Sequence, residues 1–309
     1  MLPFKKTYLI ILISITIFIL SFIFLNKLFC FNVSPYGFIN GYSSLPHNSN
    51  YCLNDKDNKV YFITNDFGAR LLSRDESKSS IKVFGDSQVL GLDVNTIDHH
   101  YLDTIYSNKN LIIFAAPNNG PYEVLNSVEL NTQAHDKIII TFNSSTDIFR
   151  IRDSYNFYDY VSLDINKAYY LVNFPILYDF IQWYSFLNKD KKNKLSNNKW
   201  MQDLFLNYKN QEILENFENY FLNFSSLIKI NKLNYEYYIT HPYWLYNIVD
   251  NELVIDNETY KKYDDLTRLI NLKFPFIKFS KIENKNIHIS DLTYDKRHLR
   301  SKNYEFDKF

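Results

Sequence analysis

An uncharged apolar segment near the N-terminus constrains this chain more than any other feature of its sequence. Thr7 to Leu25 is a run of 19 residues rich in Ile, Leu and Phe. At about 1.5 Å per residue, a helix of this length spans roughly 28 Å, close to the ~30 Å hydrocarbon core of a bilayer. Because Lys5 and Lys6 precede the run, the positive-inside bias predicts a cytoplasmic N-terminus and an extracytoplasmic remainder.

A cleaved signal peptide and a buried core helix are the alternatives to an anchor. Signal peptidase sites require small residues, and the exit from the apolar run, residues 26–31, is bulky. A lipoprotein signal requires a small residue before the cysteine, where this chain has Phe29 before Cys30. The length of the run also exceeds that of an ordinary core helix. We therefore expect residues 1–29 to be an uncleaved single-pass anchor.

Charge and cysteine content exclude some classes of function. The chain has 34 basic and 34 acidic residues, so it has no general attraction to phosphate backbones, and nucleic-acid binding is disfavoured. Hydrophobic residues make up 46% of the chain, which is sufficient for a folded core. The two cysteines, Cys30 and Cys52, have no CxxC spacing, so no zinc or thioredoxin-like motif is predicted. The sequence leaves open whether they form a disulfide.

The distribution of apolar runs predicts an α/β domain. Residues 30–80 are rich in turn signals and are interpreted as a lead-in segment, and the domain proper is expected over 81–309. Continuous β-rich runs are typical of strands buried in a parallel sheet. These runs are Ile81–Phe84, Leu111–Ala115, Ile138–Phe142, Tyr235–Ile239 and Phe274–Phe279. Pro121–Ala134 has the pattern of a helix between the second and third runs, and this βαβ rhythm predicts a doubly wound sheet.

A segment rich in Tyr, Phe, Asn and Lys separates the third and fourth predicted strands. Residues 151–230 contain no clear strand, and we interpret them as a helical insertion. Within it, Met201–Ile230 is expected to form one or two amphipathic helices. Its aromatic residues are suited to line a carbohydrate cleft, but core packing is the interpretation we favour.

The segment from Gly85 to Gly91, which begins Gly-Asp-Ser, follows the first predicted strand directly. Ligands of open α/β sheets bind beyond the carboxyl ends of the strands, so a serine at this turn would expose its hydroxyl there. The N–H groups of a following helix can also stabilise a developing oxyanion. The alternative interpretation is that Ser87 is only a helix N-cap.

A second candidate group lies near the C-terminus, where Asp295 precedes His298 by three residues. Serine is a weak nucleophile without a base, which histidine supplies near neutral pH, and a carboxylate fixes the histidine tautomer. The alternative is a solvated, charged tail. Two further loops, around Gly120 and over Asn143–Asp147, follow the second and third predicted strands and are expected at the same edge of the sheet.

In order and context, these four segments resemble the SGNH (GDSL-type) hydrolase family. Gly85-Asp86-Ser87 resembles the nucleophile block, Gly120 the second-block glycine, and Asp295-x-x-His298 the last block. Asn65–Arg70 also looks like the lead-in of membrane-anchored members linked to surface polysaccharides. The third block departs from the family pattern, because Thr146 occupies the place of the usual Asn and Asn143 lies three residues earlier.

The resemblance implies a three-layer, flavodoxin-like sheet and an extracytoplasmic serine esterase or O-acyltransferase. Ser87 is the implied nucleophile, His298 the base and Asp295 its orienting carboxylate. The implied oxyanion donors are Ser87, Gly120, and Asn143 or Thr146. The implied substrate is an acylated surface glycan or another small ester, and no cofactor or metal is needed.

Two rival interpretations remain open. The altered third block is compatible with a catalytically inactive binding or assembly module of a glycan-export system. In the second interpretation, the Gly-Asp-Ser match is accidental and the chain is a membrane-tethered α/β domain of another kind.

Two other histidine positions are weaker candidates. His99 and His100, with Asp98 and Asp103, lack a ligand spacing suited to a metal site, and we interpret them as surface residues. His241 follows the fourth predicted strand, where a structural role is favoured over a place in the cleft.

Overall fold

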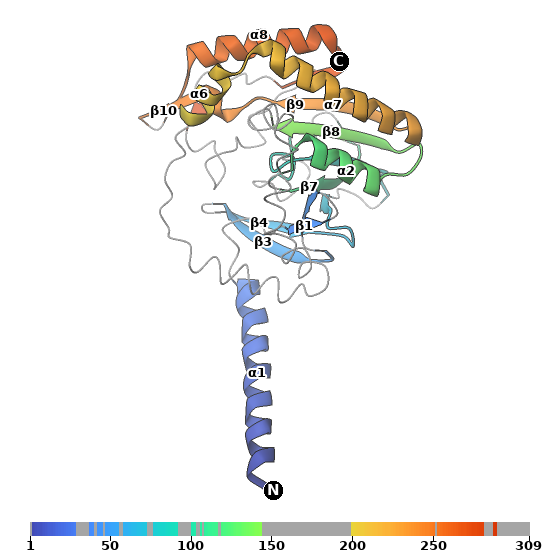
Figure 1. Ribbon diagram of the computed structural model, residues 1–309. Coiled ribbons are helices and arrows are strands. Elements are labelled where there is room, and N and C mark those ends of the chain that lie inside the picture. Colours follow the sequence, from blue (N-terminus) through green and yellow to red (C-terminus); the bar gives the residue numbers. More distant parts are fainter. Residues whose placement is uncertain are drawn as a thin grey trace.

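The architecture comes from a computed structural model of the chain (Figure 1). The residues that it describes are 2–28, 37–39, 42–45, 47–55, 58–72, 77–91, 100–102, 106, 108–116, 119–143, 199–250, 252–280 and 287–288. They form a mixed α/β protein with a mostly parallel central sheet.

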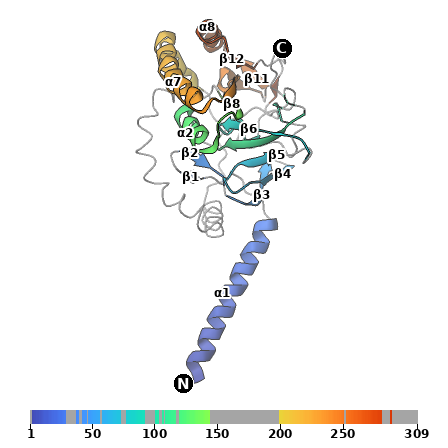
Figure 2. The ribbon, with the colours of Figure 1, turned by 90° about the vertical axis from the view of Figure 1, so that its right-hand side faces the viewer.

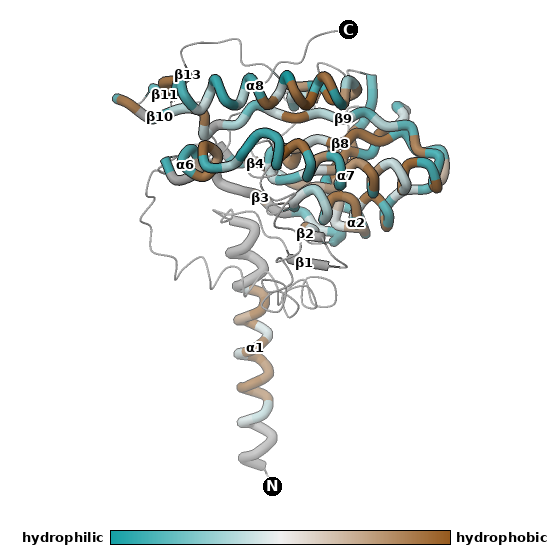
Figure 3. Tube along the Cα trace, turned by 45° about the horizontal axis from the view of Figure 1, so that its top comes forward, coloured by the Kyte–Doolittle hydropathy of each residue, from teal (hydrophilic) through white to brown (hydrophobic). Residues whose placement is uncertain are grey.

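The first element is the helix α1, Leu2–Leu28, which contains the apolar run. The side chains described in it, those of residues 7–21, are all exposed. Figures 1 and 3 show α1 extending away from the remaining elements, with a mostly hydrophobic described stretch. Among the described residues, no helix has the combination of length and hydropathy required to cross a membrane.

Short antiparallel strands lead from α1 into the central sheet. β1, Gly37–Ile39, pairs with β2, Tyr42–Ser44, and β3, Asn50–Asp55, forms a hairpin with β4, Asn58–Ile63. The next strand, β5, Arg70–Leu72, pairs antiparallel with β7, Asn110–Ala115, which belongs to the central sheet. Part of the predicted lead-in segment is therefore an edge strand of the domain that it precedes.

Cys52 on β3 is buried and disulfide-bonded. Its state was open from the sequence. The only other cysteine of the chain is Cys30, which lies outside the described residues.

The central sheet has six strands in the order β12-β9-β8-β6-β7-β5. All neighbouring pairs are parallel except β5 with β7. The five parallel strands are β6 Ser80–Gly85, β7 Asn110–Ala115, β8 Lys137–Asn143, β9 Asn234–Thr240 and β12 Ile277–Phe279. Each coincides with one of the five apolar runs that the sequence marks as strands, so that prediction is confirmed.

The last strand is shorter than expected at its beginning. Phe274 is not in the strand but is the C-cap of the helix α8, Asn257–Lys273, and its N–H donates to the carbonyl of Ile270. Pro275 follows immediately, and a proline there can neither continue the helix nor donate to a strand ladder. The apolar run is therefore divided between a helix cap and a strand.

The described helices α2, α7 and α8 lie along one face of this sheet. α2, Pro121–Asn131, follows β7, while α6, Lys199–Asn207, and α7, Asn210–Asn231, precede β9. α2 contacts α7, and α7 contacts α8, so the three lie side by side along the sheet in Figures 1 and 2. Figure 3 shows hydrophobic and hydrophilic positions alternating along α7 and α8, as expected for helices with one buried side.

Aromatic side chains fill the space between α7 and the sheet. The ring of Phe221 lies 5.1 Å from that of Tyr237 on β9, edge to face, and Tyr220 packs edge-on against Phe142 of β8. Such arrangements are the favoured geometry for aromatic pairs. The interpretation of these aromatics as core is confirmed for the described part of the segment. α7 is thus a helix of the covering layer, and the remainder of the predicted insertion, residues 151–198, lies outside the described residues.

A smaller antiparallel sheet adjoins the last helices. It comprises β10 Tyr246–Val249, β11 Glu252–Ile255 and β13 Ile287–His288, and a 3-10 turn, η2 Tyr243–Leu245, leads into it.

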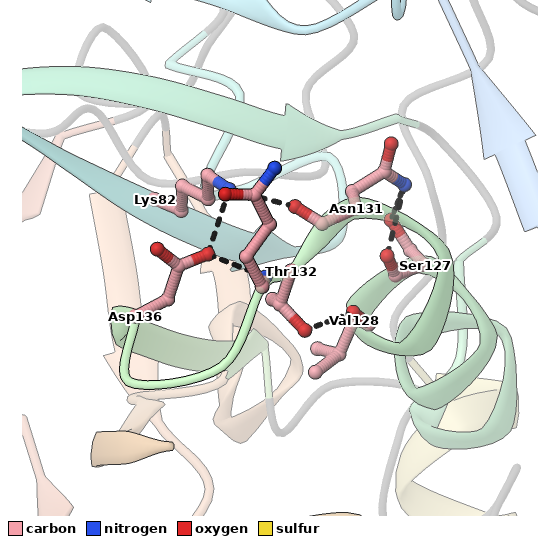
Figure 4. A network of polar contacts seen from close by, with 7 residues as sticks. Lys82, Ser127, Val128, Asn131, Thr132 and Asp136 are labelled. Atoms are coloured by element: carbon pink, nitrogen blue, oxygen red, sulfur yellow. Dashed lines mark hydrogen bonds and ion pairs between the residues drawn. The ribbon is translucent and has the colours of Figure 1, made fainter. Parts of the chain in front are cut away.

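A lysine on β6 fastens the C-terminal end of α2 to the sheet (Figure 4). The Lys82 ammonium donates to the carbonyl of Asn131 at 2.9 Å and to the Asp136 carboxylate at 2.7 Å. The same carboxylate accepts the N–H of Gln133 at 2.8 Å. Burial favours a higher pKa for Asp136, but the bonds from Lys82 and Gln133 outweigh it and lower the pKa below its ordinary value.

We expect Lys82→Met to reduce the free energy of unfolding near neutral pH by roughly 1–2 kcal/mol. The pKa of Asp136 is lowered in the folded state, so this stabilisation is present above the unfolded value of 3.8 and is lost as the pH falls through the lower folded value. Urea unfolding at neutral and strongly acidic pH should therefore show the two proteins converging in acid. Lys199→Met, at a side chain 63% exposed and paired within α6, is the control and should have little effect.

Candidate active site

The order of the strands creates one position where a crevice is expected. β6 lies between β7 and β8, so the chain moves to one side after β6 and crosses to the other side after β7. Connections that leave in opposite directions separate at the carboxyl ends of such strands, and ligands of open α/β sheets bind there. The Gly85–Ser87 segment lies at this end of β6.

Close packing against β8 explains the glycine at the end of β6. A Cβ atom at Gly85 would lie 2.2 Å from the Thr141 carbonyl oxygen and 2.5 Å from the side chain of Val89. The first neighbour is backbone of the adjacent strand and cannot move away. Only glycine therefore allows the chain to turn at this point while it remains paired with β8.

The residues after Gly85 form a single helical turn. The Asp86 carboxylate accepts the N–H of Gln88 at 2.9 Å, and the Asp86 carbonyl accepts the N–H of Leu90 at 3.3 Å. Asp86 and Gln88 are buried, whereas Ser87 is partly exposed. The turn thus gives Ser87 access to solvent at the carboxyl edge of the sheet. The side chain that caps this turn is that of Asp86, one residue before the position suggested by the N-cap alternative.

The loop after β7 is brought against the end of β6. The buried Asn119 donates its side-chain amide to the Gly85 carbonyl at 3.4 Å. Gly120 is the N-cap of α2, and its N–H donates to the Glu123 carboxylate at 3.0 Å. The N–H implied as an oxyanion donor is therefore bound to a buried carboxylate. Glu123 has to release this N–H before it can bind a substrate oxygen.

The loop after β8 is described only at its start. Gly85 is registered with Thr141, and Asn143, two residues further, is registered with Thr240 on β9. The backbone of Asn143 thus extends beyond the end of β6 at the same edge of the sheet. Its side chain, and all of Thr146 and Asp147, lie outside the described residues.

The remaining implied residues of the site, Asp295 and His298, also lie outside the described residues. The structure therefore brings together the Gly85–Ser87 and Asn119–Gly120 segments. The roles of Asn143, Thr146, Asp295 and His298 stay predictions from the sequence.

His100 is not the surface residue that we expected. Its side chain is 1% exposed, its Nε2 lies 2.9 Å from the Val89 carbonyl, and its Nδ1 accepts the N–H of Leu102 at 3.2 Å. These partners assign the proton to Nε2. Burial, followed by a smaller effect of Arg70, lowers the pKa of His100 to about 4, against the bond to Val89, so the ring is neutral. Two backbone groups therefore hold it in the interior, beside the turn that carries Ser87.

No group of three His, Cys, Asp or Glu side chains suited to a metal ion occurs among the described residues. Asp98, His99 and Asp103 are not among them.

His241 at the end of β9 has a structural environment. It is 6% exposed, and its Nε2 lies 3.2 Å from the Tyr246 hydroxyl. Tyr246, Tyr260 and Tyr263 surround the ring. Burial lowers the pKa of His241 to about 3, which leaves it neutral and suited to accept from Tyr246. The structural interpretation of this residue is in accord with these contacts.

Two supporting residues were missed as such by the sequence analysis. Glu123 was detectable, because an acidic residue at the third position of a helix commonly binds the N-cap N–H. Arg70 was noted only as part of the lead-in, yet it is fully buried beside the Ser87 turn. Its position carried no signal, because arginine is among the residues least often buried.

No family model, curated protein or solved structure matches this chain.

The two buried histidines make stability depend on pH. Their pKa values are lowered from 6.5 to about 4 for His100 and about 3 for His241, so the unfolded chain takes up protons that the folded chain does not. The stabilisation that depends on these two histidines is therefore fully present above pH 6.5. With acidification the free energy of unfolding falls, by roughly 2 kcal/mol per histidine at about pH 5.

His241→Gln keeps an acceptor for Tyr246 but does not titrate, so the loss of stability between neutral pH and about pH 5 should shrink by roughly 2 kcal/mol. Denaturant unfolding at both pH values measures this. His135→Gln, at an exposed turn, is the control for the substitution itself. An unchanged dependence in His241→Gln would contradict the assignment.

Proposed function

We propose that this protein is a membrane-anchored, extracytoplasmic serine esterase or O-acyltransferase of the SGNH type. Its substrates are ester groups, with O-acetyl groups of a cell-surface glycan as the class that we favour. The proposal extends the sequence resemblance and includes the three-layer, doubly wound architecture of that family.

The observation that carries the proposal is the contact between the first two motif segments. The Asn119 amide binds the Gly85 carbonyl, so the Gly85–Ser87 turn and the Asn119–Gly120 loop lie together at the carboxyl ends of neighbouring parallel strands. These segments are 34 residues apart in the chain. Their convergence is what a site built from a nucleophile and an oxyanion donor requires.

The strand order also supports this assignment. Numbered along the chain, the five parallel strands lie in the order 2-1-3-4-5, which is the order of flavodoxin-like doubly wound sheets. The same order occurs with many functions, so it supports the fold and the location of the site rather than the chemistry.

The proposed reaction begins with attack of Ser87 on the ester carbonyl carbon. A bond forms from Oγ to carbon, the carbonyl electron pair moves to oxygen, and the Oγ proton passes to His298. The N–H groups of Ser87 and Gly120, with Asn143 or Thr146, hold the resulting oxyanion. Collapse of this intermediate expels the alkoxide, which takes the proton from His298. Water then releases the acyl group as an acid, or a sugar hydroxyl accepts it.

The proposed location rests on residues 7–25 and on the state of Cys52. The apolar run with Lys5 and Lys6 before it favours an anchor whose C-terminal side is outside the cytoplasm. A disulfide at Cys52 supports the same side, because cytosolic thiols are kept reduced.

A non-catalytic binding module is the second candidate, and one observation favours it. The Gly120 N–H is bound to Glu123, and Thr146 stands in the place of the usual third-block Asn. A site in which two oxyanion donors are altered keeps its fold but loses transition-state stabilisation, since each donor contributes about 10²–10³ in rate.

A fluorophosphonate probe distinguishes an activated serine from an inert one. We expect the full-length protein in detergent micelles to be labelled and Ser87→Ala to be unlabelled. His298→Ala should react more slowly than the wild-type protein by about 10³-fold or by a larger factor. Labelling is measured by intact mass. Ser226→Ala, at an exposed serine of α7, is the control and should react like wild type. A folded wild-type protein that is not labelled would support the binding module.

Membrane attachment has a separate test. We expect the wild-type chain to remain in the membrane pellet after alkaline carbonate extraction. The double variant Ile11→Arg with Ile15→Arg should move to the supernatant, because each central arginine costs about 2.5–3.5 kcal/mol of insertion free energy. Thr7→Arg, at the end of the run, is the control. Release of the wild-type chain by carbonate would contradict the anchor.

A further inference from the structure

The turn that carries Ser87 is bound at its far end by two side chains from elsewhere. Three successive carbonyls close the turn, those of Val89, Leu90 and Gly91. The first binds His100, as described above. The other two accept from a single nitrogen of the Arg70 guanidinium, Nη1, at 2.6 Å in the case of Gly91. The last carbonyls of a helical turn have no partner within it, so these side chains supply the missing donors.

Arg70 is held rigidly in this position. Its side chain is 0% exposed, and its guanidinium lies over the ring of Phe62, 3.8 Å from the centroid. Its second terminal nitrogen, Nη2, donates to the Tyr61 carbonyl at 3.3 Å. One planar group therefore connects β4 and β5 with the turn after β6. A planar fork with fixed donor directions suits this arrangement better than a flexible ammonium.

The backbone of the turn is adapted to this contact. Gly91 has a φ of +66°, in the left-handed region. A Cβ atom there would lie 2.9 Å from the His100 ring and 3.3 Å from Arg70 Nη1. A side chain at this position would thus be strained and would also crowd the two groups that bind the carbonyls.

The positive charge of Arg70 lies at the opposite end of the turn from Ser87. The carbonyl end of a helical turn carries partial negative charge and its N–H end partial positive charge. Arg70 lies at the carbonyl end, whereas Ser87 lies at the start of the turn. The guanidinium is thus favourably placed at the carbonyl end of the turn, opposite the end at which Ser87 lies.

We propose that Arg70 is a positioning residue for Ser87. Through the Leu90 and Gly91 carbonyls it fixes the turn so that the hydroxyl and N–H of Ser87 are presented to the substrate. The proposal rests on the proposed function for the role of Ser87. The strands before the catalytic domain are therefore part of the support of the site.

The test uses the full-length protein in detergent micelles, with three variants. Arg70→Lys keeps the charge and loses the fork, Arg70→Ala removes both, and Arg268→Lys on α8 is the control at a side chain 69% exposed. The rate constant of fluorophosphonate labelling, kinact, and the probe affinity, KI, are measured separately. Amide hydrogen exchange is followed over residues 86–91 and, as an internal reference, over β8.

We expect Arg70→Lys to lower kinact roughly 100-fold, because a displacement of about 1 Å can cost that much, while KI changes little. Amides of residues 86–91 should exchange faster, and those of β8 should not. Guanidinium at about 10 mM, far below denaturing concentrations, should restore labelling of Arg70→Ala by at least tenfold, whereas urea of the same shape should not.

Wild-type kinact in folded Arg70→Lys would overturn the proposal, as would equal acceleration of exchange in β8, which indicates general destabilisation. If Arg70→Lys fails to fold, Arg70→Ala is folded in the presence of guanidinium instead. Its kinact is then compared before and after the guanidinium is removed. If the wild-type protein is not labelled at all, the proposed function fails, and exchange still tests the contact. Faster exchange confined to residues 86–91 then supports a fixed turn, and unchanged exchange refutes it.

Discussion

The contact between Gly85 and the Thr141 carbonyl is the constraint on which the candidate site depends. It holds the end of β6 so close to β8 that no side chain fits between them. The turn carrying Ser87 begins at the next residue, so the sheet itself sets its position. Asn119 then binds the Gly85 carbonyl and aligns the loop after β7 with the same point. Strand pairing thus determines where the turn carrying Ser87 begins, and the loop after β7 packs against that point.

The state of the Gly120 N–H relates the fold to the proposed chemistry. The bond to Glu123 completes the N-terminal end of α2, where a helix otherwise has unpaired N–H groups. The same bond competes with any substrate oxygen. The Glu123 side chain, which stabilises the helix in the free protein, is therefore the group that a substrate oxygen would have to displace.

The sequence predicts the inner strands β6, β7 and β8 well because most of their residues are buried on both faces, so these strands are almost continuously apolar. It also indicates two helical regions, Pro121–Ala134 and Met201–Ile230, although α2 already ends at Asn131. The predicted last strand begins too early, because Phe274 is the C-cap of α8. The burial of Arg70 and His100 could not be predicted. Each is stabilised by backbone carbonyls of a distant turn, and polar side chains of this kind are usually at the surface. β5 was missed for a related reason, since three residues give no periodicity.

The same short strand has a consequence for how the protein behaves among copies of itself. Within the described residues, the edges of the central sheet are β5, Arg70–Leu72, on one side and β12, Ile277–Phe279, on the other. An edge strand is a template for another chain, and a brief one offers few backbone groups for pairing. The extended middle strands, which would nucleate cross-β aggregation if exposed, are shielded by neighbours on both sides. Within the described part of the chain, the edges of the sheet therefore offer few backbone groups for pairing with another copy.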